Sequence, residues 1–142
     1  MAKLLGSQHG SPVDEQHQET RHIALTDLFD VGQLQRVQNA FSDATKVASV
    51  ITNPDGTPVT APYRFCRLCK EVIRKTKKGR ANCFYSDAVI GKQNPGGPIV
   101  QTCLSGGIWD AGASISVGGR HIGNFPMGQV KNELIAEDDG YD

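Results

Sequence analysis

The sequence predicts an α+β fold, an antiparallel sheet with flanking helices, and three observations support this prediction. Apolar residues recur every three or four positions over 32–45, which is the period of a helix. Two apolar runs near the C-terminus surround Gly118-Gly119, a strong signal for a two-residue hairpin turn. The length of 142 residues suits a single domain with one core.

The first half of the chain predicts a helix followed by a small β-hairpin. The helix covers 32–45, and the run over 47–52 is β-branched and mostly apolar, which favours a buried strand. Residues 53–56 are Asn-Pro-Asp-Gly and predict a turn, because proline presets its φ and glycine tolerates a positive φ. A short strand over 57–60 follows, and the prolines in and beside it favour a sheet edge.

The second half predicts two helices and three strands. Residues 66–78 are expected to form a helix that Gly79 ends, and 81–91 are expected to form a second helix. The basic helix face from Arg67 to Arg80 could bind phosphate, but a solvated helix face is the favoured interpretation. The strands are expected over 99–104, 109–117 and 121–130. PAS and GAF sensor domains have this general layout, although a layout does not by itself give a function.

Composition and charge argue against several classes of protein. Fifteen Lys and Arg balance fifteen Asp and Glu, so the net charge is zero, which argues against a dedicated nucleic-acid-binding protein. No apolar run approaches the roughly 18 residues of a transmembrane helix, and Leu4-Leu5 is too short for the core of a signal peptide. A cytoplasmic, reducing location is therefore expected. The polar residues 1–22 are expected to be a disordered leader.

Four cysteines form the most informative cluster in the sequence: Cys66, Cys69, Cys83 and Cys103. Thiols or metal ligands are favoured over disulfides in a reducing compartment. The Cys-x2-Cys pair suits a tetrahedral zinc site, although Cys83 and Cys103 do not form a second such pair. Two other interpretations stay open: a redox-active thiol beside Arg67, and small thiols that are buried or line a ligand site.

No catalytic motif accompanies the cysteines. The sequence lacks the phosphate-binding G-x-x-x-x-G-K-[ST], the G-x-S-x-G nucleophile elbow and the dinucleotide-binding G-x-G-x-x-G. No pair of carboxylates stands out within the expected strands as an acid and base, and His121, beside the Gly-Gly turn, is expected to be exposed. An enzyme is therefore poorly supported.

Several motifs follow one another in a specific order between residues 27 and 130. They are Asp27-Leu28-Phe29-Asp30 leading to Leu34-Gln35, the segment from Val50 to Thr60, Phe65-Cys66-Arg67-Leu68-Cys69, Gly79-Arg80-Ala81-Asn82-Cys83 with Ser86-Asp87, Cys103, and Gly123 with Gly128-Gln129-Val130. Together they resemble a PocR-type sensory domain. The resemblance covers nearly all of the expected globular part.

The resemblance implies a PAS-like module that senses small hydrocarbon derivatives such as propanediol. In longer proteins such modules are joined to histidine kinases, cyclic-dinucleotide enzymes or helix-turn-helix regulators. Where the family usually has Cys-His-Ala-Gly-Leu, this chain has Cys103-Leu104-Ser105-Gly106-Gly107, so a polar, metal-capable histidine is missing. Family members also continue past the Gly-Gln-Val strand, so residues 23–142 are interpreted as a sensory domain truncated or excised at its C-terminus.

We therefore expect a small-molecule sensor domain that binds a diol or short alcohol between the sheet and the 66–91 helices. The expected ligand-binding residues are Phe65, Trp109, Ile115 and Met127 as apolar walls, and Ser86, Asp87 and Gln129 as hydrogen-bonding groups. No catalysis, nucleic-acid contact or membrane contact is expected. A homodimer, or an output domain attached in a longer protein, is expected. The alternatives are an interaction module stabilised by zinc at the cysteines and a thiol redox sensor.

Overall fold

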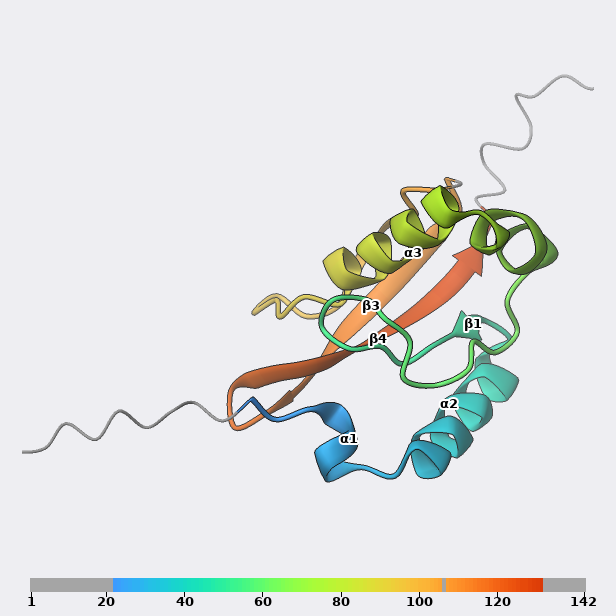
Figure 1. Cartoon of the computed structure of the whole chain (residues 1–142). Coiled ribbons are helices and arrows are strands. Elements are labelled where there is room, and N and C mark those ends of the chain that lie inside the picture. Colours follow the sequence, from blue (N-terminus) through green and yellow to red (C-terminus); the bar gives the residue numbers. More distant parts are fainter. Residues whose placement is uncertain (1–21, 106, 132–142) are drawn as a thin grey trace, which may run out of the picture.

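The computed structural model describes residues 22–105 and 107–131 and confirms the predicted α+β class (Figure 1). The helical elements are α1 (Leu25–Leu28), α2 (Val31–Thr45), the π-helical η1 (Leu68–Val72), the 3₁₀ turn η2 (Ile73–Lys75) and α3 (Lys77–Ile90). The strands are β1 (Ala48–Ser49), β2 (Ile99–Thr102), β3 (Trp109–Val117) and β4 (Arg120–Val130). The expected leader, apart from His22, and the expected end of the domain beyond Lys131 lie outside these residues. No helix in the described ranges is long and apolar enough to cross a membrane.

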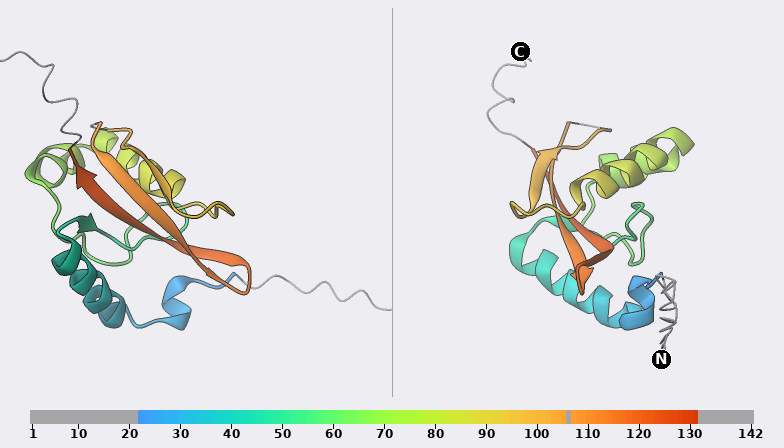
Figure 2. Two further views of the ribbon diagram at one scale, coloured as in Figure 1. Left: turned by 180° about the vertical axis from the view of Figure 1, so that it is seen from behind. Right: turned by 90° about the vertical axis from the view of Figure 1, so that its left-hand side faces the viewer.

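The four strands form one antiparallel sheet in the order β1-β4-β3-β2. Helix α3 packs on one face, against β2, β3 and β4, and α2 lies on the other face (Figure 2). The ring of Phe41 in α2 meets Phe125 of β4 edge-on, with 5.1 Å between the ring centroids. Helices therefore flank both faces of the sheet, and each face can hold its own site.

Two predicted elements are confirmed almost residue for residue. The helix expected over 32–45 is α2, which starts after Asp30 because that carboxylate accepts a hydrogen bond from the Gln33 N–H at 3.0 Å. The predicted hairpin is formed by β3 and β4, with Val117 opposite Arg120 on either side of the Gly-Gly turn. Strong local signals, a cap and a two-residue turn, set both elements.

The helix predicted over 66–78 is wrong at its end. The helical path breaks at Thr76, whose backbone is extended and whose hydroxyl accepts a hydrogen bond from the Gly79 N–H at 3.0 Å, and α3 begins there. Gly79 lies inside α3. A Cβ on it would lie 2.1 Å from the Ile73 carbonyl oxygen, so this glycine allows a close approach to η2 and does not end a helix.

The strands predicted over 47–52 and 57–60 are much shorter than expected. Only Ala48 and Ser49 form a strand, and the second run contributes a single bridge between Pro58 and Thr52. Backbone hydrogen bonds persist here in an irregular arrangement, because the Ile51 carbonyl oxygen accepts from the N–H groups of both Val59 and Thr60. The buried Gln38 of α2 donates to the Ser49 carbonyl oxygen at 2.9 Å and accepts from the Thr60 hydroxyl, so a helix side chain adds hydrogen bonds to this irregular pairing.

The hydrophobic core gathers around Leu25, Ile51 and Ile122, which are at most 4 % exposed. Ile115 of β3 packs against this cluster. The core thus joins α1, the chain after β1 and the hairpin on one side of the molecule, and the space between the sheet and α3 is filled by different residues.

Candidate ligand-binding cavity

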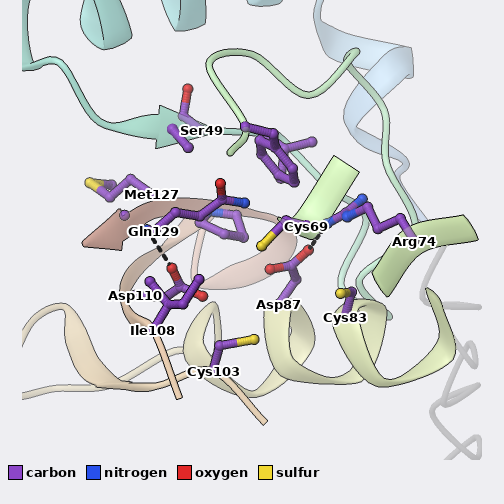
Figure 3. Close-up of a pocket in the computed structure, with 15 residues that line it drawn as sticks. Ser49, Cys69, Arg74, Cys83, Asp87, Cys103, Ile108, Asp110, Met127 and Gln129 are labelled. Carbon is purple, nitrogen blue, oxygen red and sulfur yellow. Dashed lines mark hydrogen bonds and ion pairs between the residues drawn. The ribbon is translucent and has the colours of Figure 1, made fainter. Parts of the chain in front are cut away.

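A cavity of about 30 Å³ lies between the sheet and the helical segment that runs from η1 to α3 (Figure 3). Its lining is Ala48, Ser49, Val50, Phe65, Cys69, Arg74, Cys83, Asp87, Cys103, Ile108, Asp110, Pro126, Met127, Gly128 and Gln129. Apolar groups make up most of this wall, and a few polar groups point into it, which is the usual composition of a small-molecule site. The location matches the place where the sequence predicts a pocket.

Arg74 and Asp87 form a buried ion pair at the cavity. Nη2 of Arg74 lies 3.1 Å from Oδ2 of Asp87, and the two side chains are 14 % and 10 % exposed. The guanidinium carbon lies 4.6 Å from the centroid of the Phe65 ring and 5.6 Å from that of Phe84. Nε of Arg74 is buried and has no hydrogen-bond partner among the described residues. The guanidinium is thus held in place, and one of its donors is unpartnered.

Asp110 supplies a second carboxylate. It follows a register shift at the start of β3, and its Oδ1 accepts a hydrogen bond from the Gln129 N–H at 2.7 Å. The thiol of Cys103 donates to the same carboxyl group. Gln129 has a φ of 60°, an unusual conformation for this residue type, and its Oε1 accepts from the Cys66 N–H at 2.6 Å. Gln129 therefore ties the end of β4 both to β3 and to the chain that leads into η1.

Burial raises the pKa of both carboxyl groups. The pKa of Asp87 rises from 3.8 to about 7, because burial disfavours its charge and the charge of Asp110 adds to the effect, while Arg74 opposes it. The pKa of Asp110 is raised by its burial, and the hydrogen bonds from Gln129 and Cys103 and the charge of Arg74 oppose that shift. Both groups keep their protons to a higher pH than an exposed aspartate does.

We expect the free energy of unfolding to fall as the pH rises from about 4 to about 7. In this window folded Asp87 still holds a proton that the unfolded chain has lost, so raising the pH favours unfolding until both states are ionised. Urea unfolding at several pH values measures this slope. Asp87→Asn should flatten it, whereas Glu71→Gln, at an exposed position, should leave it unchanged. Equal slopes in wild type and Asp87→Asn would contradict the assignment.

Three of the four cysteines, Cys69, Cys83 and Cys103, line the cavity. Burial raises the pKa of Cys69 to about 12, with a hydrogen bond to Cys66 adding to it, and burial also raises the pKa of Cys83. Neutral thiols are weak nucleophiles, which disfavours the redox interpretation. No group of three or more His, Cys, Asp or Glu within 22–105 and 107–131 is placed to hold a metal ion. Zinc stays a prediction, which metal analysis of the purified protein tests.

The structure brings together seven of the eleven residues that the sequence singled out as a ligand or metal site. They are Phe65, Cys69, Cys83, Asp87, Cys103, Met127 and Gln129. Ser86 is buried in α3, where its hydroxyl accepts a hydrogen bond from the Leu104 N–H at 3.4 Å, and it does not line the cavity. Cys66 contributes through its hydrogen bond to Cys69.

Trp109, which the sequence predicts as an apolar wall, does not line the cavity. It faces a groove on the opposite side of the sheet, beside Phe41 of α2 and the exposed Val100 and Val130. The reason is the alternation of a strand: Trp109 and Asp110 are neighbours in sequence, so their side chains leave opposite faces. Ile115 likewise belongs to the hydrophobic core, so both expected apolar walls from β3 are wrong.

Arg74 and Asp110 are the charged site residues that the sequence did not predict, and the apolar walls Val50 and Ile108 were not predicted either. The sequence assigns Arg74 to a solvated face, yet it is the one cation between Arg64 and Arg80 that is not exposed. The signal for Asp110 was available, because a carboxylate within an otherwise uncharged strand either pairs or faces a polar site. The π-helical path of η1, which changes the helix period just before Arg74, had no recognisable sequence signal.

Comparison with known proteins gives one match. The family model described as the sensory domain found in PocR matches residues 27–140. No curated protein and no solved structure matches the chain. The matched range covers most of the chain and contains every residue that lines the cavity. The chain therefore belongs to the family of the sensory domain found in PocR.

Proposed function

We propose that the chain is the sensory domain of a prokaryotic signalling or transcription-regulatory protein and binds a small hydrocarbon derivative, such as a diol or short alcohol, in the cavity beside α3. The family match over 27–140 carries the sensor role. The activity proposed is binding, and the output belongs to a partner or an attached domain.

The chemistry of the cavity supports a ligand with both apolar and hydroxyl parts. Val50, Phe65 and Ile108 offer apolar surface to a short carbon chain. The carboxyl groups of Asp87 and Asp110 can accept hydrogen bonds from hydroxyl groups, and the unpartnered Nε of Arg74 can donate one. A short diol uses all of these features.

The small size of the cavity supports a conformational change of the domain when the ligand binds. A volume of about 30 Å³ holds about two water molecules. A diol of about five non-hydrogen atoms is larger, so its binding requires the walls to move apart. A ligand shifts a conformational equilibrium only if it prefers one of the two states, and a cavity that must widen supplies that preference.

The same size limits the affinity. At the ceiling of about 1.5 kcal/mol per non-hydrogen atom, a ligand of about five such atoms gains at most roughly 7.5 kcal/mol. A dissociation constant in the micromolar range is therefore the best case, and the cost of widening the cavity weakens it further. Titrations need to extend to millimolar ligand.

Val50→Ile is expected to weaken the binding of 1,2-propanediol strongly. Val50 is 1 % exposed and lines the cavity, and one more methylene group occupies much of its small volume. Amide chemical shifts followed in a ¹H–¹⁵N titration up to millimolar diol give the affinity and show which residues respond. The affinity of the variant should fall at least about tenfold, or about 1.4 kcal/mol.

Val117→Ile is the matched control, because Val117 is 43 % exposed at the far end of β3 and does not line the cavity. It should bind the diol as wild type does. Equal binding by both variants would place the ligand elsewhere. A panel of short diols, alcohols and aldehydes that leaves every amide shift unchanged would overturn the proposed function.

A further inference from the structure

The charged groups of the cavity do not balance. Among its lining residues, only Arg74, Asp87 and Asp110 carry ionisable acid or base groups other than thiols. The thiols of Cys69 and Cys83 are uncharged at neutral pH, because burial raises the pKa of each. The site therefore holds one permanent cation and two carboxyl groups, and it is one positive charge short when both are ionised.

The guanidinium of Arg74 is held in an ion pair with Asp87. The 3.1 Å contact between them, and the two aromatic rings of Phe65 and Phe84 beside the guanidinium, hold the arginine on that carboxylate. Its Nε remains without a partner. Arg74 can thus offer a ligand one hydrogen-bond donor, while its charge is already paired.

The hydrogen-bond partners of Asp110 are all neutral, and the charge of Arg74, which is paired with Asp87, acts on Asp110 without an ion pair between them. The carboxyl group of Asp110 accepts hydrogen bonds from the Gln129 N–H and from the Cys103 thiol, and no salt bridge to it forms among the described residues. A carboxylate removed from water without a cation is costly, and either a proton or a positively charged ligand group removes that cost. A ligand cation has the further advantage of gaining a charge-assisted hydrogen bond.

We propose that the preferred ligand is a short amino alcohol, whose protonated amino group binds Asp110 and whose hydroxyl oxygen accepts a hydrogen bond from Nε of Arg74. The proposal rests on the proposed function, because it concerns the ligand of the same cavity. It narrows the ligand class from small hydrocarbon derivatives in general to those that carry a positive charge. The apolar wall of Val50, Phe65 and Ile108 keeps the carbon chain short.

Three compounds with one carbon skeleton test this inference: 1-amino-2-propanol, 1,2-propanediol and lactate. Near pH 7.5 they are a cation, a neutral molecule and an anion of nearly equal size. Amide shift titrations of the full chain should give the amino alcohol an affinity at least about tenfold higher than the diol, and lactate should not bind at millimolar concentration. Asp110→Asn should lower the amino alcohol's affinity at least about tenfold. It should lower the diol's affinity by a clearly smaller factor, because the amide oxygen can still accept a hydrogen bond from a hydroxyl group but carries no charge for an ammonium group.

Asp110→Asn retains an oxygen that can accept from the Gln129 N–H, and Asp55→Asn at an exposed position is the matched control. A diol that binds wild type as tightly as the amino alcohol would overturn the inference and leave the proposed function intact. Unchanged amino alcohol affinity in Asp110→Asn would also overturn it. Failure of all three compounds to bind wild type would count against the proposed function itself. The comparison of the three compounds on the wild-type protein does not depend on the variant, so it decides the question even if Asp110→Asn does not fold.

Discussion

Replacing Arg74 with alanine is expected to lower the free energy of unfolding by about 3–5 kcal/mol at pH 8, because Asp87 is left as a buried carboxylate without its cation. The loss of contact with the Phe65 and Phe84 rings adds to this effect. At pH 5 the loss should be smaller, since the pKa of Asp87 is about 7 even with Arg74 present and the neutral acid needs no cation. Urea unfolding at the two pH values measures both quantities.

Arg67→Ala is the matched control for this prediction. Arg67 also pairs with a carboxylate, Glu71 at 3.3 Å, but the two side chains are 90 % and 51 % exposed, so the expected change is within about 0.5 kcal/mol. The double replacement Arg74→Met with Asp87→Leu removes both charges and should recover most of the lost stability. Similar losses for Arg74→Ala and Arg67→Ala at pH 8 would show that the buried pair contributes no more than a surface pair.

Gly56→Ala is expected to lower the free energy of unfolding by about 3–5 kcal/mol. Gly56 has a φ of +88°, which an L-residue adopts only with strain, and a Cβ there would lie 1.7 Å from the Phe84 carbonyl oxygen in α3. The added methyl group must therefore push the 53–56 turn away from the helix. Both the strain and the displacement contribute, and thermal or urea unfolding measures their sum.

Gly97→Ala separates the two contributions. Gly97 has a φ of +103°, and a Cβ there would meet no atom within 4 Å, so this variant carries the strain without the clash. Its expected loss is about 1–2 kcal/mol. A Gly56→Ala variant that is no less stable than Gly97→Ala would mean that the turn does not press against α3 in solution.

The sequence predicted correctly those helices and strands whose ends are set by neighbouring residues in the chain. The end of α2 at Thr45 and the turn between β3 and β4 depend on neighbouring residues, and both were predicted within one residue. The strands over 47–52 and 57–60 are shorter than predicted, because their backbone hydrogen bonds form isolated bridges and the side chain of the distant Gln38 joins both segments. A β-branched run shows that a segment is extended and buried, but it does not show which groups it pairs with.

The candidate site was predictable in its general location and less so in its chemistry. The cysteine pattern pointed to the right helices, since Cys69 and Cys83 both line the cavity. The charges were missed for a physical reason. Whether Arg74 is solvated or buried depends on Asp87, thirteen residues further along the chain, and on two aromatic rings, and no local pattern encodes that meeting.

The cavity and the groove beside Trp109 lie on opposite faces of the same sheet, and this has a consequence for signalling. Asp110, Met127 and Gly128 line both the cavity and the groove beside Trp109 on the opposite face. A molecule seated in the groove and a solute in the cavity therefore press on the same three residues. Thermodynamic reciprocity then applies: if filling the cavity strengthens binding at the groove by some factor, occupying the groove must strengthen the cavity's hold on its solute by that same factor. A partner that binds in the groove in response to the ligand would therefore also change the affinity of the cavity for that ligand.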